Sequence, residues 1–145
     1  MINTGLMNWQ SWAFLSAVFA ALTAIFAKIG VSNINSDMAT LIRTVIILCV
    51  LALIVLATGQ WEELSAIPSR TWLFLTLSAL ATGASWVCYF RALKIGDAAR
   101  VAPVDKLSIV LVAVFGALIL GERLSATNWL GVGLCTAGIV LVALR

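Results

Sequence analysis

The chain has 145 residues, of which 63% are apolar and 10% are charged, and its mean hydropathy is +1.11. Because a soluble domain usually carries about 25% charged residues, this composition excludes a soluble globular protein. The chain has no histidine, and Cys49, Cys88 and Cys135 stand singly in three different apolar runs, which matches no metal or dithiol spacing.

The apolar residues lie in runs long enough to cross a bilayer. Residues 1–27, 72–90, 107–121 and 124–144 contain no charged side chain, and residues 38–58 contain only Arg43. Since a spanning helix needs about 20 apolar residues, the runs predict five helices, at residues 9–29, 38–58, 71–92, 101–120 and 126–144. We therefore expect an all-α integral membrane protein, formed by residues 1–145 as one five-helix domain.

The first span and the flanking charges predict how the chain enters the membrane. The opening "MINTGLMNWQ" has no Lys or Arg, so we expect the first helix to be retained rather than cleaved as a signal peptide. Basic residues favour the cytoplasmic side. One side carries Lys28, Arg43, Arg91, Lys94, Arg100, Lys106 and Arg145, and the other carries Arg70 and Arg123. This bias predicts an outside N-terminus and a cytoplasmic C-terminus in the cell's inner (plasma) membrane.

The third span contains aromatic residues deep in the apolar run. Trp86 lies three residues before Tyr89 and four before Phe90, so the three rings share a helix face. A buried Tyr hydroxyl and Trp N–H require partners. This face either lines a cavity for an organic solute or packs against a neighbouring helix.

The fourth span begins with "VAPVDKLSIVLV", which holds Pro103, Asp105 and Lys106. Ionisable residues inside a membrane usually mark a site. If the helix starts at Val101, Asp105 lies only about 6 Å from its end, and Pro103 suits the first turn. If the helix starts at Ala98, Pro103 loosens it and frees carbonyls beside the charges.

The two charges of the fourth span require partners. Adjacent helical residues point about 100° apart, so Asp105 and Lys106 are expected to be poor partners for each other. We expect Arg43 to pair with Asp105 and Asp37 to pair with Lys106. These charges either join helices or line a substrate path.

The fifth span has a small-residue surface. Ser125 and Thr127 are suitable N-caps for it, and Gly121 is expected to close the helix before it. Gly131 and Gly138 are seven residues apart and so lie on one face. Close backbone approach is how membrane helices associate, so this face is expected to contact another chain or another helix of the same unit.

No enzyme signature is present. The sequence has no Ser/His or Cys/His combination, no phosphate-binding glycine loop and no paired catalytic carboxylates. No basic run suits nucleic acid. We expect no catalysis, no cofactor, no metal and no nucleic-acid partner.

Several stretches resemble the EamA domain of the drug/metabolite transporter superfamily. They are "LSAVFAALTAIFAKIGV", "DMATLIRTVII" and "YFRALKIGDAARVAPVDKLSIVLVAVFGALILGERLSATNWLGVGLCTAGIVLVAL". The resemblance is to the short members with one five-helix domain. It implies a carrier of small metabolites or amino-acid-like solutes, often an exporter, and dimer contact through the last helix, where Gly131 and Gly138 lie.

The resemblance implies a homodimer working by alternating access. The family's inverted repeats favour an antiparallel pair, whereas the charge bias favours a single orientation, and both remain open. Trp12, Trp86 and Tyr89 would supply apolar walls, and Asp105, Lys106 and Arg43 a polar mouth. The alternatives are a non-transporting subunit of another membrane protein and a carrier of a lipid-linked substrate.

Overall fold

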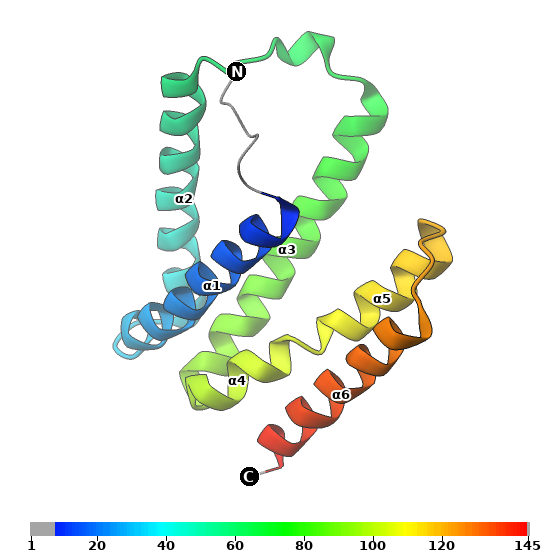
Figure 1. The fold of residues 1–145 in the computed structure, drawn as a ribbon. Coiled ribbons are helices and arrows are strands. Elements are labelled where there is room, and N and C mark those ends of the chain that lie inside the picture. Colours follow the sequence, from blue (N-terminus) through cyan, green and yellow to red (C-terminus); the bar gives the residue numbers. More distant parts are fainter. Residues whose placement is uncertain (1–7, 145) are drawn as a thin grey trace. The chain divides into compact units, whose positions relative to one another are not determined.

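A computed structural model describes residues 8–144, and every regular element within them is a helix. In chain order (Figure 1) these are α1 (Trp9–Val31), α2 (Ser36–Thr58), the short 3-10 helix η1 (Leu64–Ala66), α3 (Ser69–Ile95), α4 (Ala98–Asp105), α5 (Ser108–Ile119) and α6 (Ala126–Ala143). The helices fall into two compact units, which are described separately. One contains α1 as far as Lys28 together with α4, α5 and α6, and the other contains the last turn of α1 with α2, η1 and α3.

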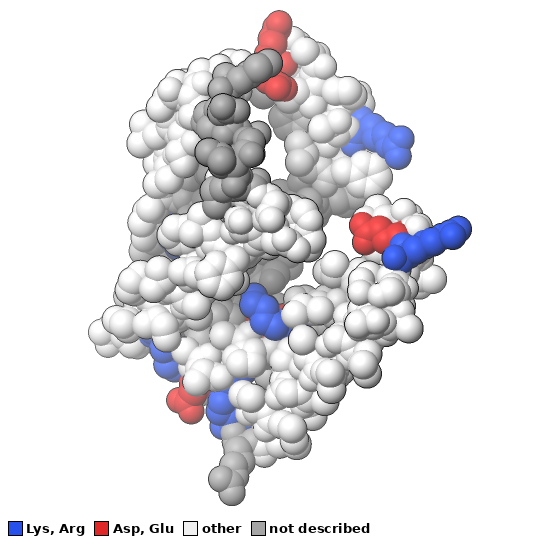
Figure 2. Space-filling view, viewed as in Figure 1, with Lys and Arg blue, Asp and Glu red and all other residues white. Residues whose placement is uncertain are grey.

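The five predicted spans are confirmed. Segments long and apolar enough to cross a membrane are Trp9–Val31, Ser36–Thr58, Ser69–Ile95, Ala98–Ile119 and Ala126–Ala143. Every boundary lies within three residues of its predicted position. Large apolar side chains such as Leu48, Leu53 and Leu80 are each 66% exposed, and Figure 2 shows a largely uncharged surface. Lipid tails accept such a surface, so the chain is an all-helical, multi-pass membrane protein.

Local chemistry sets both ends of α2. The side-chain oxygen of Asn35 accepts hydrogen bonds from the backbone N–H groups of Asp37 and Met38, at 2.8 and 3.4 Å. This satisfies two of the donors that a helix start leaves unpaired. At the other end Gly59 adopts φ +64°. That left-handed conformation is accessible to glycine at little cost, and it turns the chain out of the helix.

The core of the α2–α3 unit lies where α2 begins and α3 ends. Leu93, Val31, Phe90 and Ala39 are buried there, with exposures of 0, 1, 3 and 8%. Farther along α2 and α3 the side chains are mostly exposed. The two helices are therefore held together at one end.

The fourth span is interrupted. It begins at Ala98, so Pro103 lies inside α4, which confirms the second of the two predicted alternatives. Proline has no N–H to donate to the carbonyl four residues earlier. Lys106 and Leu107 instead donate to the carbonyls of Pro103 and Val104, at 2.9 and 3.0 Å. These tighter i to i−3 bonds separate α4 from α5.

The turn between α5 and α6 follows the prediction. Gly121 has φ +70° and ends the fourth span. The Ser125 hydroxyl oxygen then accepts from the backbone N–H of Asn128 at 3.2 Å and caps α6. Helix α6 packs against α4 and α5. A Cβ added at Gly131 or Gly138 would meet no other atom within 4 Å, so space is open beside this glycine face.

Candidate functional site

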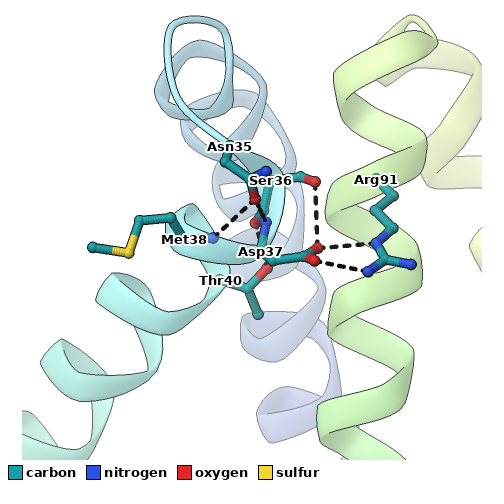
Figure 3. Close-up of polar contacts among 6 residues, drawn as sticks. All are labelled: Asn35, Ser36, Asp37, Met38, Thr40 and Arg91. Carbon is teal, nitrogen blue, oxygen red and sulfur yellow. Dashed lines mark hydrogen bonds and ion pairs between the residues drawn. The ribbon is translucent and has the colours of Figure 1, made fainter.

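A bidentate ion pair joins the start of α2 to the end of α3 (Figure 3). The Arg91 Nε donates to Asp37 Oδ1 at 2.9 Å, and the Arg91 Nη2 donates to Asp37 Oδ2 at 2.7 Å. Asp37 lies in the first turn of α2, where the helix dipole favours a negative charge. The fork geometry of the guanidinium fixes the direction of approach as well as the distance. This contact therefore orients α2 against α3.

Lys94 holds the end of α1 and the following turn. Its Nζ donates to the carbonyl oxygens of Val31, Ser32 and Ile34, at 2.8, 2.7 and 2.9 Å. The carbonyls at a helix end carry partial negative charge and lack helical donors. Sequence reasoning used Arg91 and Lys94 only to orient the chain. Their spacing of three residues at the end of a span, on one helix face, was the available signal for a shared role.

Beside the Asp37–Arg91 pair, α2 and α3 form a groove with a cavity volume of about 630 Å³. Four hydroxyl side chains reach it, two from each helix and four residues apart on each. Its lining consists of Asp37, Thr40, Leu41 and Thr44 from α2, and Leu75, Ser78, Ala79, Thr82, Gly83, Trp86 and Val87 from α3. The site thus combines an apolar wall with a row of hydroxyl groups inside two membrane spans.

The threonine hydroxyls of the groove are oriented by their own helices. Thr40, Thr44 and Thr82 each donate to the carbonyl four residues earlier, at 2.9, 2.8 and 2.9 Å. A hydroxyl has one proton to donate and two lone pairs to accept with. Because each hydroxyl proton is already used in a hydrogen bond to the backbone, these three oxygens can only accept hydrogen bonds from a ligand. Sequence reasoning missed the four hydroxyl residues, although the i, i+4 pairs in apolar runs were visible.

Arg43 and Trp86, both predicted as site residues, lie together. The guanidinium carbon of Arg43 is 4.4 Å from the Trp86 ring centroid and 5.6 Å from that of Phe90. Attraction between a cation and an aromatic face holds such an arrangement. Tyr89 meets Phe90 edge-on with centroids 6.4 Å apart. Trp86 therefore contacts the cation and also lines the groove.

The expectation that Asp105 and Lys106 do not pair with each other is wrong. The Lys106 Nζ lies 3.1 Å from Asp105 Oδ2, although adjacent helical residues point apart. The lysine stem is long and flexible, so its ammonium reaches the neighbouring carboxylate even though the two residues point apart. Asp37, expected to pair with Lys106, is paired with Arg91.

The predicted site residues are divided between the two units. Trp12, half exposed at 53%, lies in the α1, α4–α6 unit with Asp105 and Lys106. Arg43, Trp86 and Tyr89 lie in the α2–α3 unit. Among residues 8–144 no group of three or more acidic, Cys or His side chains is arranged to hold a metal ion.

Comparison with known proteins gives a consistent picture. The model of the EamA-like transporter family matches residues 7–144. A protein of Sinorhizobium sp. named "Uncharacterized transporter in cobO 3'region" is 71% identical over 136 residues, covering 94% of this chain and 96% of that protein. The probable 4-amino-4-deoxy-L-arabinose-phosphoundecaprenol flippase subunit ArnE of Hamiltonella defensa subsp. Acyrthosiphon pisum (strain 5AT) is 27% identical over 86 residues, covering 59% of this chain and 76% of that protein. No solved structure gives a significant match.

Proposed function

The chain belongs to the EamA-like transporter family, and on that premise we propose that it exports a small metabolite or amino-acid-like solute through the α2–α3 groove. The observation that carries this proposal is the row of hydroxyls from Thr40, Thr44, Ser78 and Thr82 along one groove. The hydroxyls of Thr40, Thr44 and Thr82 donate to their own helices, and their oxygens still have lone pairs to accept with. A solute with N–H or O–H groups would therefore find several hydrogen-bond acceptors side by side within the spans.

The size and lining of the groove support a small-molecule ligand. Ligand sites usually enclose roughly 300–1,000 Å³, with mostly apolar walls and a few polar groups. The groove has about 630 Å³ and combines leucine, alanine and valine side chains with hydroxyls and Asp37. This composition suits a solute that is partly apolar and forms several hydrogen bonds.

The interrupted fourth span supports transport by alternating access. Discontinuous helices are common beside transporter sites because their free backbone groups and mobile halves serve binding and gating. In this proposal Pro103 supplies the break in the fourth span. The N-terminus faces outside and the C-terminus faces the cytoplasm, in the inner (plasma) membrane.

A homodimer completes the proposed transporter. The open space beside Gly131 and Gly138 supports the use of this face by a second copy, since small residues let membrane helices approach closely. Parallel and antiparallel pairs both remain compatible with this contact.

Solute flux in proteoliposomes tests the groove. We expect Thr44→Val to lower flux by about 2- to 10-fold, the worth of one hydrogen bond. Thr58→Val is the matched control, because the Thr58 hydroxyl also donates to the carbonyl four residues earlier, at 2.8 Å, but Thr58 does not line the groove. Equal flux in the Thr44→Val and wild-type proteins would contradict the role of the groove.

A second candidate function rests on the likeness to a flippase subunit. In this alternative the chain is a subunit that handles a lipid-linked substrate with a partner protein. It predicts no solute flux from the purified chain alone and a stable hetero-complex after mild detergent extraction. Flux by the chain on its own would exclude it.

A further inference from the structure

Arg43 is placed within the apolar thickness of the membrane. It lies seven residues after Ser36, the first residue of α2, or about 10 Å along the helix axis at 1.5 Å per residue. Helix α2 has 23 residues, so it is only slightly longer than a hydrocarbon core of about 30 Å. The backbone of Arg43 thus lies well inside the hydrocarbon region rather than at its edge.

The Arg43 side chain does not reach back to the membrane surface. Its guanidinium carbon lies over Trp86 and Phe90, which precede the end of α3 at Ile95 by nine and five residues. These positions correspond to about 13 and 7 Å from that end. The cation therefore remains near the depth of its own backbone, where long basic side chains usually extend toward water instead.

The Arg43 guanidinium has no hydrogen-bond acceptor within the α2–α3 unit. A guanidinium has five N–H donors. Within the α2–α3 unit, residues 29–95, Asp37 is paired with Arg91, and no hydrogen bond joins Arg43 to another residue of the unit. Aromatic faces offset part of the cost of a cation in hydrocarbon, but they accept no conventional hydrogen bond. The N–H groups of Arg43 are therefore available to an anionic group from outside this unit.

We propose that Arg43 binds a carboxylate or phosphate group of the transported molecule, and that the groove oxygens accept hydrogen bonds from N–H or O–H groups of the same molecule. This inference rests on the proposed transport function and names its substrate class. Trp86 links the two parts, because its ring contacts Arg43 and also lines the groove. The substrate then has an anionic end at Arg43 and a donor-bearing body in the groove.

The bonding of the threonine hydroxyls explains why the body must carry donors. The hydroxyls of Thr40, Thr44 and Thr82 already donate hydrogen bonds to backbone carbonyls. Their oxygens can therefore act only as acceptors, which complements ammonium, amide or hydroxyl groups. Leu41 and Leu75 line the same groove and favour an apolar part of the molecule. An anion that has no N–H or O–H donor would form no hydrogen bonds to these oxygens and would lose their contribution to its affinity.

Uptake into proteoliposomes tests this chemistry with defined probes. Leucine has the anion, the donor and the apolar part. Leucinamide lacks the anion, and 4-methylpentanoate lacks the ammonium donor. Glucosamine 6-phosphate and glucosamine form the corresponding phosphate pair. We expect the uptake of leucine to exceed that of leucinamide and 4-methylpentanoate, or the uptake of glucosamine 6-phosphate to exceed that of glucosamine. The expected difference is about tenfold or more, which corresponds to one charge-assisted hydrogen bond.

Substitutions at Arg43 test whether this residue carries the preference. Arg43→Gln should abolish the preference for the anion, and Arg43→Lys should retain part of it, because the charge stays while the fork is lost. Arg70→Gln is the matched control: Arg70 lies over Phe74, 5.8 Å from its ring centroid, and Phe74, unlike Trp86, does not line the groove. Size-exclusion profiles verify that each variant is folded.

A lipid could supply the same anionic group. A fluorescent polyprenyl phosphate in the same vesicles, followed by dithionite quenching, separates this source from a soluble one. Movement of that lipid with loss in Arg43→Gln would support the inference with a lipid-borne anion. If probes move but Arg43→Gln keeps the wild-type preference, the inference fails and the transport function stands. If the wild-type chain moves none of these probes, both fail.

Discussion

Replacing Gly83 by phenylalanine is expected to abolish transport while the protein still folds and inserts. Gly83 lines the α2–α3 groove, and a Cβ added there would meet no atom within 4 Å. The backbone therefore accepts a side chain at this position, and a helix interior prefers most residues to glycine. The added ring would project into the space proposed for the solute. Flux in proteoliposomes should fall to the level of protein-free vesicles.

The control for this steric block is Gly30→Phe. Gly30 is also helical and also has open space at the position of its Cβ, but it does not line the groove. The flux of the Gly30→Phe protein should equal that of the wild-type protein. Wild-type flux in a folded Gly83→Phe protein would show that the solute passes elsewhere.

The double substitution Gly131→Leu with Gly138→Leu is expected to convert the proposed dimer into monomers and to remove flux. The two glycines lie on one face of α6, with open space beside each. Two leucine side chains would fill that space and prevent close backbone approach, on which packing of membrane helices depends. Mass measurement in detergent or native mass spectrometry reports the change directly.

Gly133→Leu is the matched control on the same helix. Gly133 is two residues from Gly131, so it points about 200° away from the glycine face. It also has open space beside its Cβ. A dimer that persists in the double variant, or one lost equally in Gly133→Leu, would contradict the proposed interface. A reporter at the C-terminus then distinguishes parallel from antiparallel pairs by whether one or both orientations occur.

Features set by local chemistry could be predicted from the sequence. The spans follow from apolar runs that match the bilayer thickness, so all five lie where expected. Gly121 and Ser125 end and begin helices for reasons that involve only neighbouring backbone groups. Arg43 stood out because a lone charge in an apolar run is costly.

Features that depend on tertiary contact or on a flexible side chain could not be predicted in the same way. The Asp37–Arg91 pair joins residues 54 positions apart, and a count of charges does not identify their partners. The expected separation of Asp105 and Lys106 considered only the directions in which the two residues point, whereas the flexible lysine side chain bridges that angle. The groove hydroxyls were overlooked because threonine and serine are tolerated in spans when they bond to their own backbone.

Accessibility of Ser78 to a charged thiol reagent tests the central claim, that the α2–α3 groove is the solute path, most directly. Ser78→Cys would be introduced after replacement of Cys49, Cys88 and Cys135 by alanine. We predict that a membrane-impermeant methanethiosulfonate cation modifies this cysteine, that modification stops flux, and that a transported solute slows the reaction. Leu80→Cys, on the same helix but outside the groove lining, should remain unmodified in lipid. An unreactive Ser78→Cys, or one whose modification leaves flux unchanged, would contradict the account.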